Sequence, residues 1–169
     1  MFSKNKEKIF HITWVTYNSR VSERMIKYKI KKWEWIYFSD EQEILITLYI
    51  KDIVKKDKLK VLAYNICKDH IHMLLICKED EISNIVRKLK WKSSQKYKKY
   101  LWINKEEKFS LWAQKYNNSF IETSDKFIET VKYIKNNRNK HELQTNKKLQ
   151  CVINDMIYIY DETLLNKGL

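Results

Sequence analysis

Two histidines separated by one residue are the first feature of this sequence that could do chemistry. His70 and His72 open an apolar, β-branched segment, His70–Cys77, of the kind that forms a β-strand. Side chains two positions apart on a strand point to the same face, so the two imidazoles would stand side by side. Such a pair can chelate a metal ion, and two half-buried histidines without a ligand fit the same spacing.

A tyrosine and an asparagine four residues apart form the second feature. Tyr133 and Asn137 lie in residues 125–141, where apolar residues recur at spacings of four and three and predict a helix. Residues four apart share a helix face, and Tyr133 borders the apolar stripe without belonging to it. A tyrosine hydroxyl there could be a nucleophile or simply the polar end of a half-buried ring. Because the chain has eleven tyrosines, spacing alone does not single out this one.

Basic and aromatic residues alternate in residues 87–99. They are Arg87, Lys88, Lys90, Lys92, Lys96, Lys98 and Lys99, interleaved with Trp91 and Tyr97. This mixture suits neutralisation of phosphates together with stacking of bases. A solvated helix face with aromatic anchors is the alternative interpretation.

The elements that would position these residues alternate between strands and helices. Strands are expected at residues 9–17, 59–66, 70–77 and 109–122, and helices at residues 40–55, 81–101 and 125–141. We expect Ser124 to cap the last helix, and Ile44, Leu45, Leu48 and Val54 to lie near the buried stripe of the first. The order predicts an α+β fold: a ferredoxin-like βαββαβ sandwich with a central antiparallel sheet, helices packed on one face, and a further C-terminal helix. Residues 18–40 are expected to be irregular or a short helix, and residues 151–160 a helix or a strand.

Composition limits the class of protein. The 169 residues fit one domain, 1–169, and 34 Lys and Arg against 21 Asp and Glu give a net charge of +13, which favours nucleic acid or an anionic membrane surface as partner. No apolar run is long enough to span a bilayer, and residues 1–9 lack the apolar core of a signal peptide, so a cytoplasmic protein without membrane contact is expected. The three cysteines have no zinc-site spacing and predict reduced thiols.

Read together, four segments resemble the single-tyrosine HUH transposases, including the REP-associated tyrosine transposases. They are FHITWVTY (residues 10–17), CKDHIHMLL (67–75), LWAQKY (111–116) and YIKNN (133–137). The resemblance runs from about residue 9 to residue 143, and residues 144–169 form an extension that matches nothing. Arg138 and Glu142 stand where REP-associated members often have Pro and Gly, and residues 18–40 look longer than in typical members.

The resemblance implies an enzyme that cleaves and rejoins single-stranded DNA beside hairpins through a 5′-phosphotyrosine, without ATP. Tyr133 would be the catalytic nucleophile, and His70, His72 and Asn137 would hold Mg²⁺ or Mn²⁺. We expect Arg87, Lys88, Trp91 and Lys92 to contact the DNA. A homodimer is expected, although some REP-associated relatives are monomers.

Three other classes of protein are alternatives to this interpretation. A ferredoxin-like sheet with surface aromatics also describes non-catalytic nucleic-acid-binding modules, in which His70 and Tyr133 would be replaceable. A domesticated relative that serves host DNA processing would have the same sequence features. A structural zinc protein is disfavoured, because no second Cys/His pair lies at finger spacing.

Overall fold

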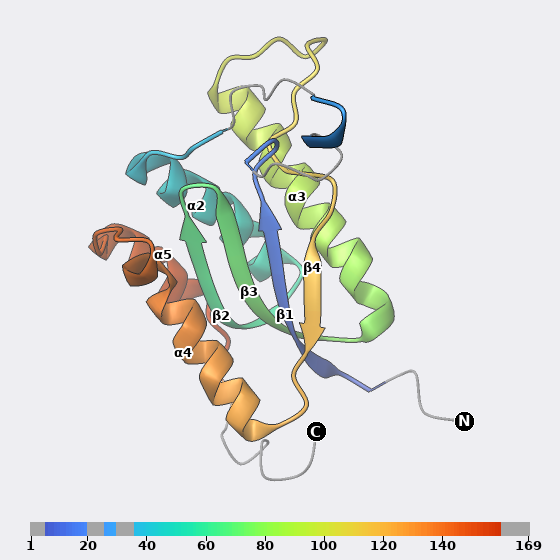
Figure 1. Ribbon diagram of the computed structural model, residues 1–169, viewed down its shortest axis with the longest axis vertical. Helices are drawn as coiled ribbons and strands as arrows, with labels where there is room; N and C mark the ends of the chain where they lie inside the picture. The colour runs from blue at the N-terminus through green and yellow to red at the C-terminus, as the bar shows by residue number, and fades with distance from the viewer. Residues whose placement is uncertain (1–5, 20–25, 30–35, 160–169) are drawn as a thin grey trace.

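The computed structural model describes residues 6–19, 26–29 and 36–159, and its centre is a four-stranded antiparallel sheet (Figure 1). The strands are β1 (Lys8–Val15), β2 (Lys60–Cys67), β3 (His70–Cys77) and β4 (Asn117–Phe120), in the spatial order β2-β3-β1-β4. This order places the hairpin of β2 and β3 beside β1, as in a ferredoxin-like sheet. The predicted fold class is therefore confirmed. Most of residues 18–40 lies outside the described residues.

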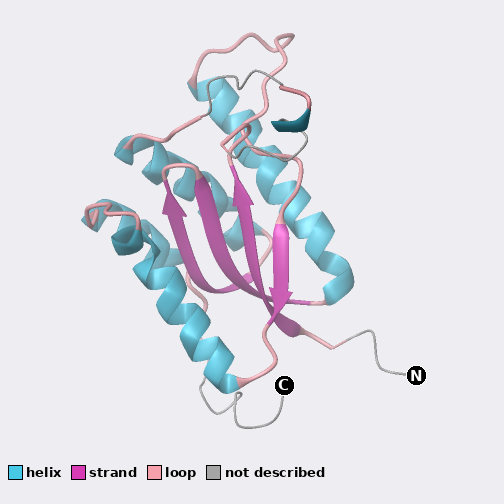
Figure 2. Cartoon of the chain, in the orientation of Figure 1, coloured by secondary structure: helices cyan, strands magenta, loops and turns pink. Residues whose placement is uncertain are grey.

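Helices connect and cover the strands (Figure 2). They are α2 (Asp40–Lys56), the short 3₁₀ helix η1 (Glu79–Glu81), α3 (Ile82–Tyr100), α4 (Ser124–Lys140) and α5 (Lys147–Met156). Ser39 caps α2 in a reciprocal capping box with Gln42. None of the helices in the described ranges is long and apolar enough to cross a membrane.

The alternation of side chains along β3 separates two apolar layers. Ile71, Met73 and Leu75 point to one face and pack in the main core with α2, α3 and α5. Leu74 points to the other face, where it joins Phe127 and Ile134 of α4 in a second, smaller core. His70 and His72 share the parity of Leu74, so they lie on the face that α4 covers.

Three details differ from the sequence prediction. The N-cap of α4 is Thr123, whose hydroxyl accepts a hydrogen bond from the Lys126 amide at 3.2 Å, and Ser124 is the first helical residue. Of the residues predicted for the buried stripe of α2, Val54 is buried, whereas Ile44, Leu45 and Leu48 are only half-buried. The fully buried apolar residues of this helix are Ile46, Ile50, Ile53 and Val54. In the expected strand at residues 109–122, only β4 is a strand, preceded by a loop with one isolated bridge.

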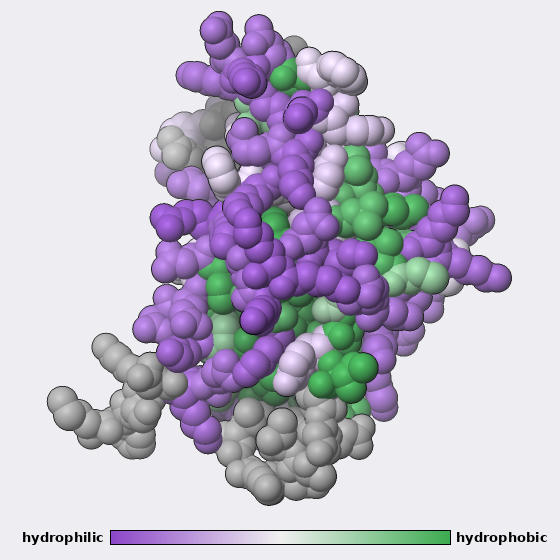
Figure 3. Space-filling model, turned by 180° about the vertical axis from the view of Figure 1, so that it is seen from behind, coloured by the Kyte–Doolittle hydropathy of each residue, from purple (hydrophilic) through white to green (hydrophobic). Residues whose placement is uncertain are grey.

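Seen from behind, the surface is mostly hydrophilic, with apolar residues gathered in patches between the charged ones (Figure 3). This is the surface expected of a chain in which a third of the residues are charged. Hydropathy therefore marks no single functional site on this face.

Candidate active site

All four histidines of the sequence lie in one row, three on the α4 face of the sheet and His141 at the C-terminal end of α4. The ring centroids are 5.2 Å apart for His11 and His72, 5.1 Å for His72 and His70, and 4.9 Å for His70 and His141. β1 and β3 bring the first three together, because the register pairs Thr13 with His72. Residues far apart in the sequence thus converge on one place.

The two histidines of the His-x-His segment are each held through Nδ1. The Nδ1 of His70 lies 2.6 Å from Asp69 Oδ1, and the Nδ1 of His72 lies 3.0 Å from both His11 Nε2 and Thr13 Oγ1. Both rings are buried. A carboxylate that accepts a hydrogen bond from Nδ1 leaves the lone pair on Nε2, so Asp69 favours the His70 tautomer that can bind a cation.

Asn137 faces His70 from α4. Its Oδ1 lies 3.0 Å from His70 Nε2, and its buried Nδ2 has no hydrogen-bond partner. The Cys67 thiol donates to the same Oδ1 at 3.0 Å, and burial raises the pKa of Cys67 to about 12, which keeps that donor protonated. An imidazole lone pair and an amide oxygen that converge in this way are both electron-pair donors to a cation.

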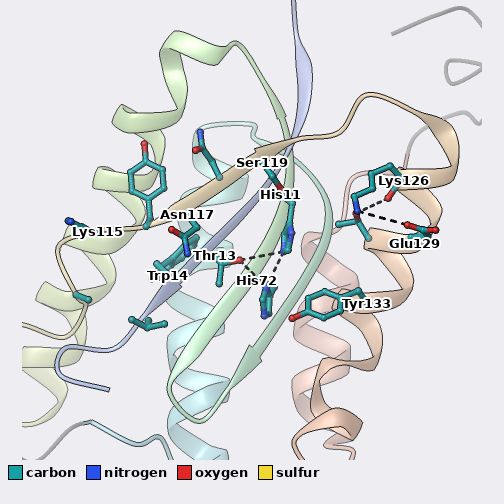
Figure 4. A pocket seen from close by; sticks show the side chains of 15 residues that line it. His11, Thr13, Trp14, His72, Lys115, Asn117, Ser119, Lys126, Glu129 and Tyr133 are labelled. Carbon is teal, nitrogen blue, oxygen red and sulfur yellow. Dashed lines mark hydrogen bonds and ion pairs between the residues drawn. The ribbon is translucent and has the colours of Figure 1, made fainter. Parts of the chain in front are cut away.

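Tyr133 borders the row of histidines. Its ring lies 5.2 Å from the His72 ring, nearly perpendicular to it, and 6.1 Å from the ring of His11. The side chain is 40% exposed and lines a cavity of about 770 Å³ together with His11, Thr13 and His72. Figure 4 shows the Tyr133 ring reaching from α4 toward His72 across this cavity. A hydroxyl on this ring is open to a substrate that the cavity would admit.

The charged side chains of the lining give the cavity a small positive balance. Lys115 and Lys126 line it, with Glu129 as the acidic residue among the lining side chains. Lys126 also acts on His11: burial, and secondarily the Lys126 charge, lower the pKa of this histidine below its usual value. The lowered pKa favours the neutral form of His11, so the charge of the lining comes from the two lysines and from Glu129, which lies 4.0 Å from Lys126.

Contacts on β2 fix α4 in place. Asn65 Nδ2 donates to the carbonyl of Ile134 at 2.7 Å, one residue after Tyr133. Arg138 is buried and donates to Glu43 Oε2 at 2.7 Å and to the carbonyl of Ile66 at 3.0 Å. These contacts involve Ile134 and Arg138, the residues that directly follow Tyr133 and Asn137 along the helix, so they set where both side chains stand.

The predicted DNA-binding residues separate into two groups. Arg87 and Trp91 line a second cavity, of about 480 Å³, along α3, and Trp91 is 61% exposed. Lys88 instead forms an ion pair with Asp57 at 2.5 Å, and Lys92 is absent from the lining of this cavity. The second cavity shares Ala113 and Tyr116 with the first, so the two adjoin.

Sequence reasoning gave no role to His11, Thr13 and Asp69, which hold the rings of His70 and His72. A signal existed, since His11 and Thr13 are polar side chains at alternate positions of an otherwise apolar strand and must share a face. Within the described ranges, no three His, Cys, Asp or Glu side chains are grouped to hold a metal. The predicted set of His70, His72 and Asn137 falls outside groups of this kind, because Asn137 would contribute an amide oxygen.

Comparisons with known proteins found a matching family model and similar solved structures. A family model described as "Transposase IS200 like" matches residues 5–137. The structure of a REP-associated tyrosine transposase bound to a REP hairpin is similar with a TM-score of 0.55 and 16% identity, over 80% of this chain and 69% of that one. A candidate transposase from Deinococcus radiodurans R1 is similar with a TM-score of 0.52 and 18% identity, over 77% of this chain and 90% of that one.

No curated protein matches the sequence. At their low identity the two solved structures show that the fold is shared, and the family model covers most of the chain. The resemblance to single-tyrosine transposases seen in the sequence is thereby confirmed. The protein belongs to the IS200-like transposase family.

Proposed function

We propose that this transposase cleaves and rejoins single-stranded DNA with Tyr133 as nucleophile. The observation that carries the proposal is the position of the Tyr133 ring, 5.2 Å from His72 and open to a cavity with a positive balance of charge. The hydroxyl would attack a phosphodiester, forming a bond between tyrosine oxygen and phosphorus and releasing a 3′-hydroxyl on the leaving strand. Because the new ester conserves the energy of the old one, the 3′-hydroxyl of another strand can reverse the step without ATP.

His70, His72 and Asn137 would hold a divalent cation, Mg²⁺ or Mn²⁺. The residues fit such an ion, because Asp69 leaves the His70 lone pair on Nε2, 3.0 Å from the amide oxygen of Asn137, and both atoms can donate electron pairs to a cation. When bound, the ion would polarise the phosphoryl oxygens. His11 and Thr13 hold the His72 ring beside Tyr133, and Lys126 and Lys115 supply charge for the flanking phosphates.

The substrate proposed is a DNA hairpin with an adjoining single strand. The similar REP-associated transposase was solved bound to a REP hairpin, and this chain has a net charge of +13. The second cavity, with Arg87 and Trp91, adjoins the first and would contact the strand by phosphate pairing and base stacking. Lys88 and Lys92 would contribute charge near the helix, with Lys88 already paired to Asp57.

The test is the formation of a covalent protein–DNA adduct. The protein would be incubated with labelled single-stranded oligonucleotides that carry hairpins from its own flanking DNA, with Mn²⁺, with Mg²⁺, or with EDTA, and run on a denaturing gel. We expect an adduct with either metal and none with EDTA, because the uncompensated phosphate charge opposes attack. Binding of the hairpins without an adduct under any metal would favour a non-catalytic nucleic-acid-binding module instead.

A second expectation concerns how the site is assembled. Tyr133, His70, His72 and Asn137 come together within one chain, so even in a homodimer each chain would carry a complete site. A mixture of the His70→Ala and Tyr133→Phe variants should therefore form no more adduct than either variant alone. The measurement is the adduct yield of the mixture at equal total protein. Recovery of roughly a quarter to a half of the wild-type yield would mean that the tyrosine of one chain serves the histidines of another.

A further inference from the structure

A third cavity, of about 1160 Å³, lies at the C-terminal end of α3 and has no part in the proposed chemistry. Its aromatic walls are Tyr49 of α2, Tyr100 at the end of α3, and Trp102 in the following turn. It shares Gln95 with the second cavity, which in turn shares Ala113 and Tyr116 with the first. The second cavity therefore neighbours both of the others, the first through Ala113 and Tyr116 and the third through Gln95.

Trp102 is held out into solvent by an ordered turn. Its side chain is 94% exposed, and its φ of 56° is a left-handed backbone conformation that few non-glycine residues adopt. The Trp102 amide donates to the carbonyl of Lys99 at 3.1 Å, and the Ile103 amide donates to the carbonyl of Lys98 at 3.2 Å. The Lys98 ammonium donates to the carbonyls of Lys105 and Glu107, which ties down the returning loop. The turn fixes the backbone from which this large ring projects.

The other two rings are also supported. Tyr100 is 45% exposed and packs at 5.9 Å on Tyr97, which is buried against Phe38 and Phe109. Lys96 lies 5.1 Å above the Tyr49 ring. Three aromatic rings around one cavity are a surface on which flat, unpaired bases can stack.

The charge of the lining has one sign. Lys96, Lys98, Lys99 and Lys105 line the cavity, and its lining includes neither Asp nor Glu. Lys96 is paired with Asp52 outside the cavity and Lys98 with backbone carbonyls, so Lys99 and Lys105 contribute most of the charge available to a ligand. Single-stranded nucleic acid can pair its phosphates with the lysines and stack its bases on the rings, whereas the carboxylates of an acidic peptide would pair only with the lysines.

We propose that this cavity, the Trp102 cleft, binds unpaired bases of the DNA strand that continues from the cleavage site along α3. The inference rests on the proposed function, because it takes the substrate to be single-stranded DNA that enters the first cavity. Trp91 in the second cavity and Trp102 in the third would then be successive stacking platforms on one strand. The cleft extends recognition beyond the hairpin.

The test varies the length of the single strand. Fluorescence anisotropy would give the affinity of the full chain for hairpins with 5′ or 3′ tails of increasing length, for wild type, Trp102→Ala and the control Tyr158→Ala. Tyr158 is also an exposed aromatic, but it lies where its amide bonds to β2, outside the three cavities. We expect wild type and the control to gain affinity once one tail reaches the cleft, and Trp102→Ala to lose about tenfold with those long tails. Equal affinities of wild type and Trp102→Ala at every tail length would overturn the proposal.

A charge variant gives a second readout. Replacing Lys99 and Lys105 with glutamine should reduce the slope of log K against log salt for long tails by about 1.4, or about 0.7 for each lost phosphate contact. Lys148→Gln, which removes an exposed lysine of α5, should leave the difference between long and short tails unchanged. An unchanged slope in the double variant would contradict a phosphate contact at the cleft.

The adduct assay on the same oligonucleotides separates this proposal from the previous one. If the protein forms the adduct but Trp102→Ala binds the same oligonucleotides as tightly as wild type, the proposal for the Trp102 cleft fails and the cleavage proposal stands. If the binding of long tails depends on Trp102 but the protein never forms an adduct, the proposal for the Trp102 cleft stands and the cleavage proposal fails. Circular dichroism of Trp102→Ala should match wild type, since the exposed ring carries little packing.

Discussion

Replacing Tyr133 with phenylalanine is expected to abolish the covalent adduct, by at least on the order of 10³-fold, since only the hydroxyl can carry the phosphoryl group. The phenylalanine ring would keep the perpendicular contact with His72 and the contact with His11. Binding of the DNA should therefore persist, and loss of the adduct would report chemistry alone. Adduct yield on a denaturing gel and affinity by anisotropy measure the two effects on the same preparations.

The matched control is Tyr158→Phe, which removes the hydroxyl of a tyrosine of nearly equal exposure that does not line the cavity. It should form adduct at the wild-type level. An adduct that persists in Tyr133→Phe would place the nucleophile on another of the eleven tyrosines, and peptide mapping of the DNA-linked fragment would identify it. His70→Ala, assayed beside them, tests the proposed cation site, because the adduct should also be lost while Tyr133 is unchanged.

The fold could be predicted from the sequence because apolar residues recur with different spacings in its strands and in its helices. The segment His70–Cys77 is continuously apolar and β-branched, and it forms β3 with those bounds, as a strand covered on both faces should. Helix α3 begins one residue from the expected start, because acidic residues precede it and its apolar residues recur at helical spacing. The alternation of two such patterns was sufficient to predict the ferredoxin-like order.

The buried face of α2 could not be predicted in the same way. Its central residues, ILITLYI, are apolar around most of the helix, so the sequence defines no single stripe. Tertiary packing decides: Ile46 and Ile50 face the main core, while Ile44 and Leu45 are left half-buried at its margin. β4 was predicted too long for a related reason, since an exposed edge strand of four residues has no buried side chain to mark its ends.

The candidate site was predictable in part. His70 with His72 and Tyr133 with Asn137 follow from spacing within one element, because strand and helix periods fix which neighbours share a face. That the two pairs meet, with 3.0 Å between His70 Nε2 and Asn137 Oδ1, depends on how α4 lies across the sheet. No local pattern contains that information, and only the resemblance to a family joined the two pairs.

A buried ion pair that sequence spacing did not reveal also joins α4 to the rest of the fold. Arg138 and Glu43 are 95 residues apart, and their side chains meet at 2.7 Å beneath the end of α4. Arg138 also donates to the carbonyls of Ile66 and Gln144, so one guanidinium joins α4 to β2, to α2 and to the segment before α5. Glu43 is fully buried, and its Oε1 has no hydrogen-bond partner, with Lys68 Nζ 3.9 Å away.

We expect Arg138→Met to destabilise the fold by about 3–5 kcal/mol, because removing one partner leaves the other charge buried and uncompensated. Urea unfolding followed by circular dichroism measures the change. The control Lys132→Met removes an exposed cation of the same helix and should change stability by less than about 0.5 kcal/mol. The double variant Glu43→Met with Arg138→Met should recover much of the loss, since it removes both charges together.

The loss of stability in Arg138→Met should also depend on pH, in a direction that follows from the pKa of Glu43. Burial raises the pKa of Glu43 above its usual 4.5 even with Arg138 present, and loss of the guanidinium would raise it further. The folded state then holds a proton that the unfolded state releases, so the stability of Arg138→Met should fall as pH rises above the unfolded pKa. Its deficit against wild type should be smaller near about pH 5 than near about pH 8. A deficit that is the same at both pH values, or no larger than that of Lys132→Met, would mean that packing of α4, rather than the ion pair, places Tyr133 and Asn137 over the sheet.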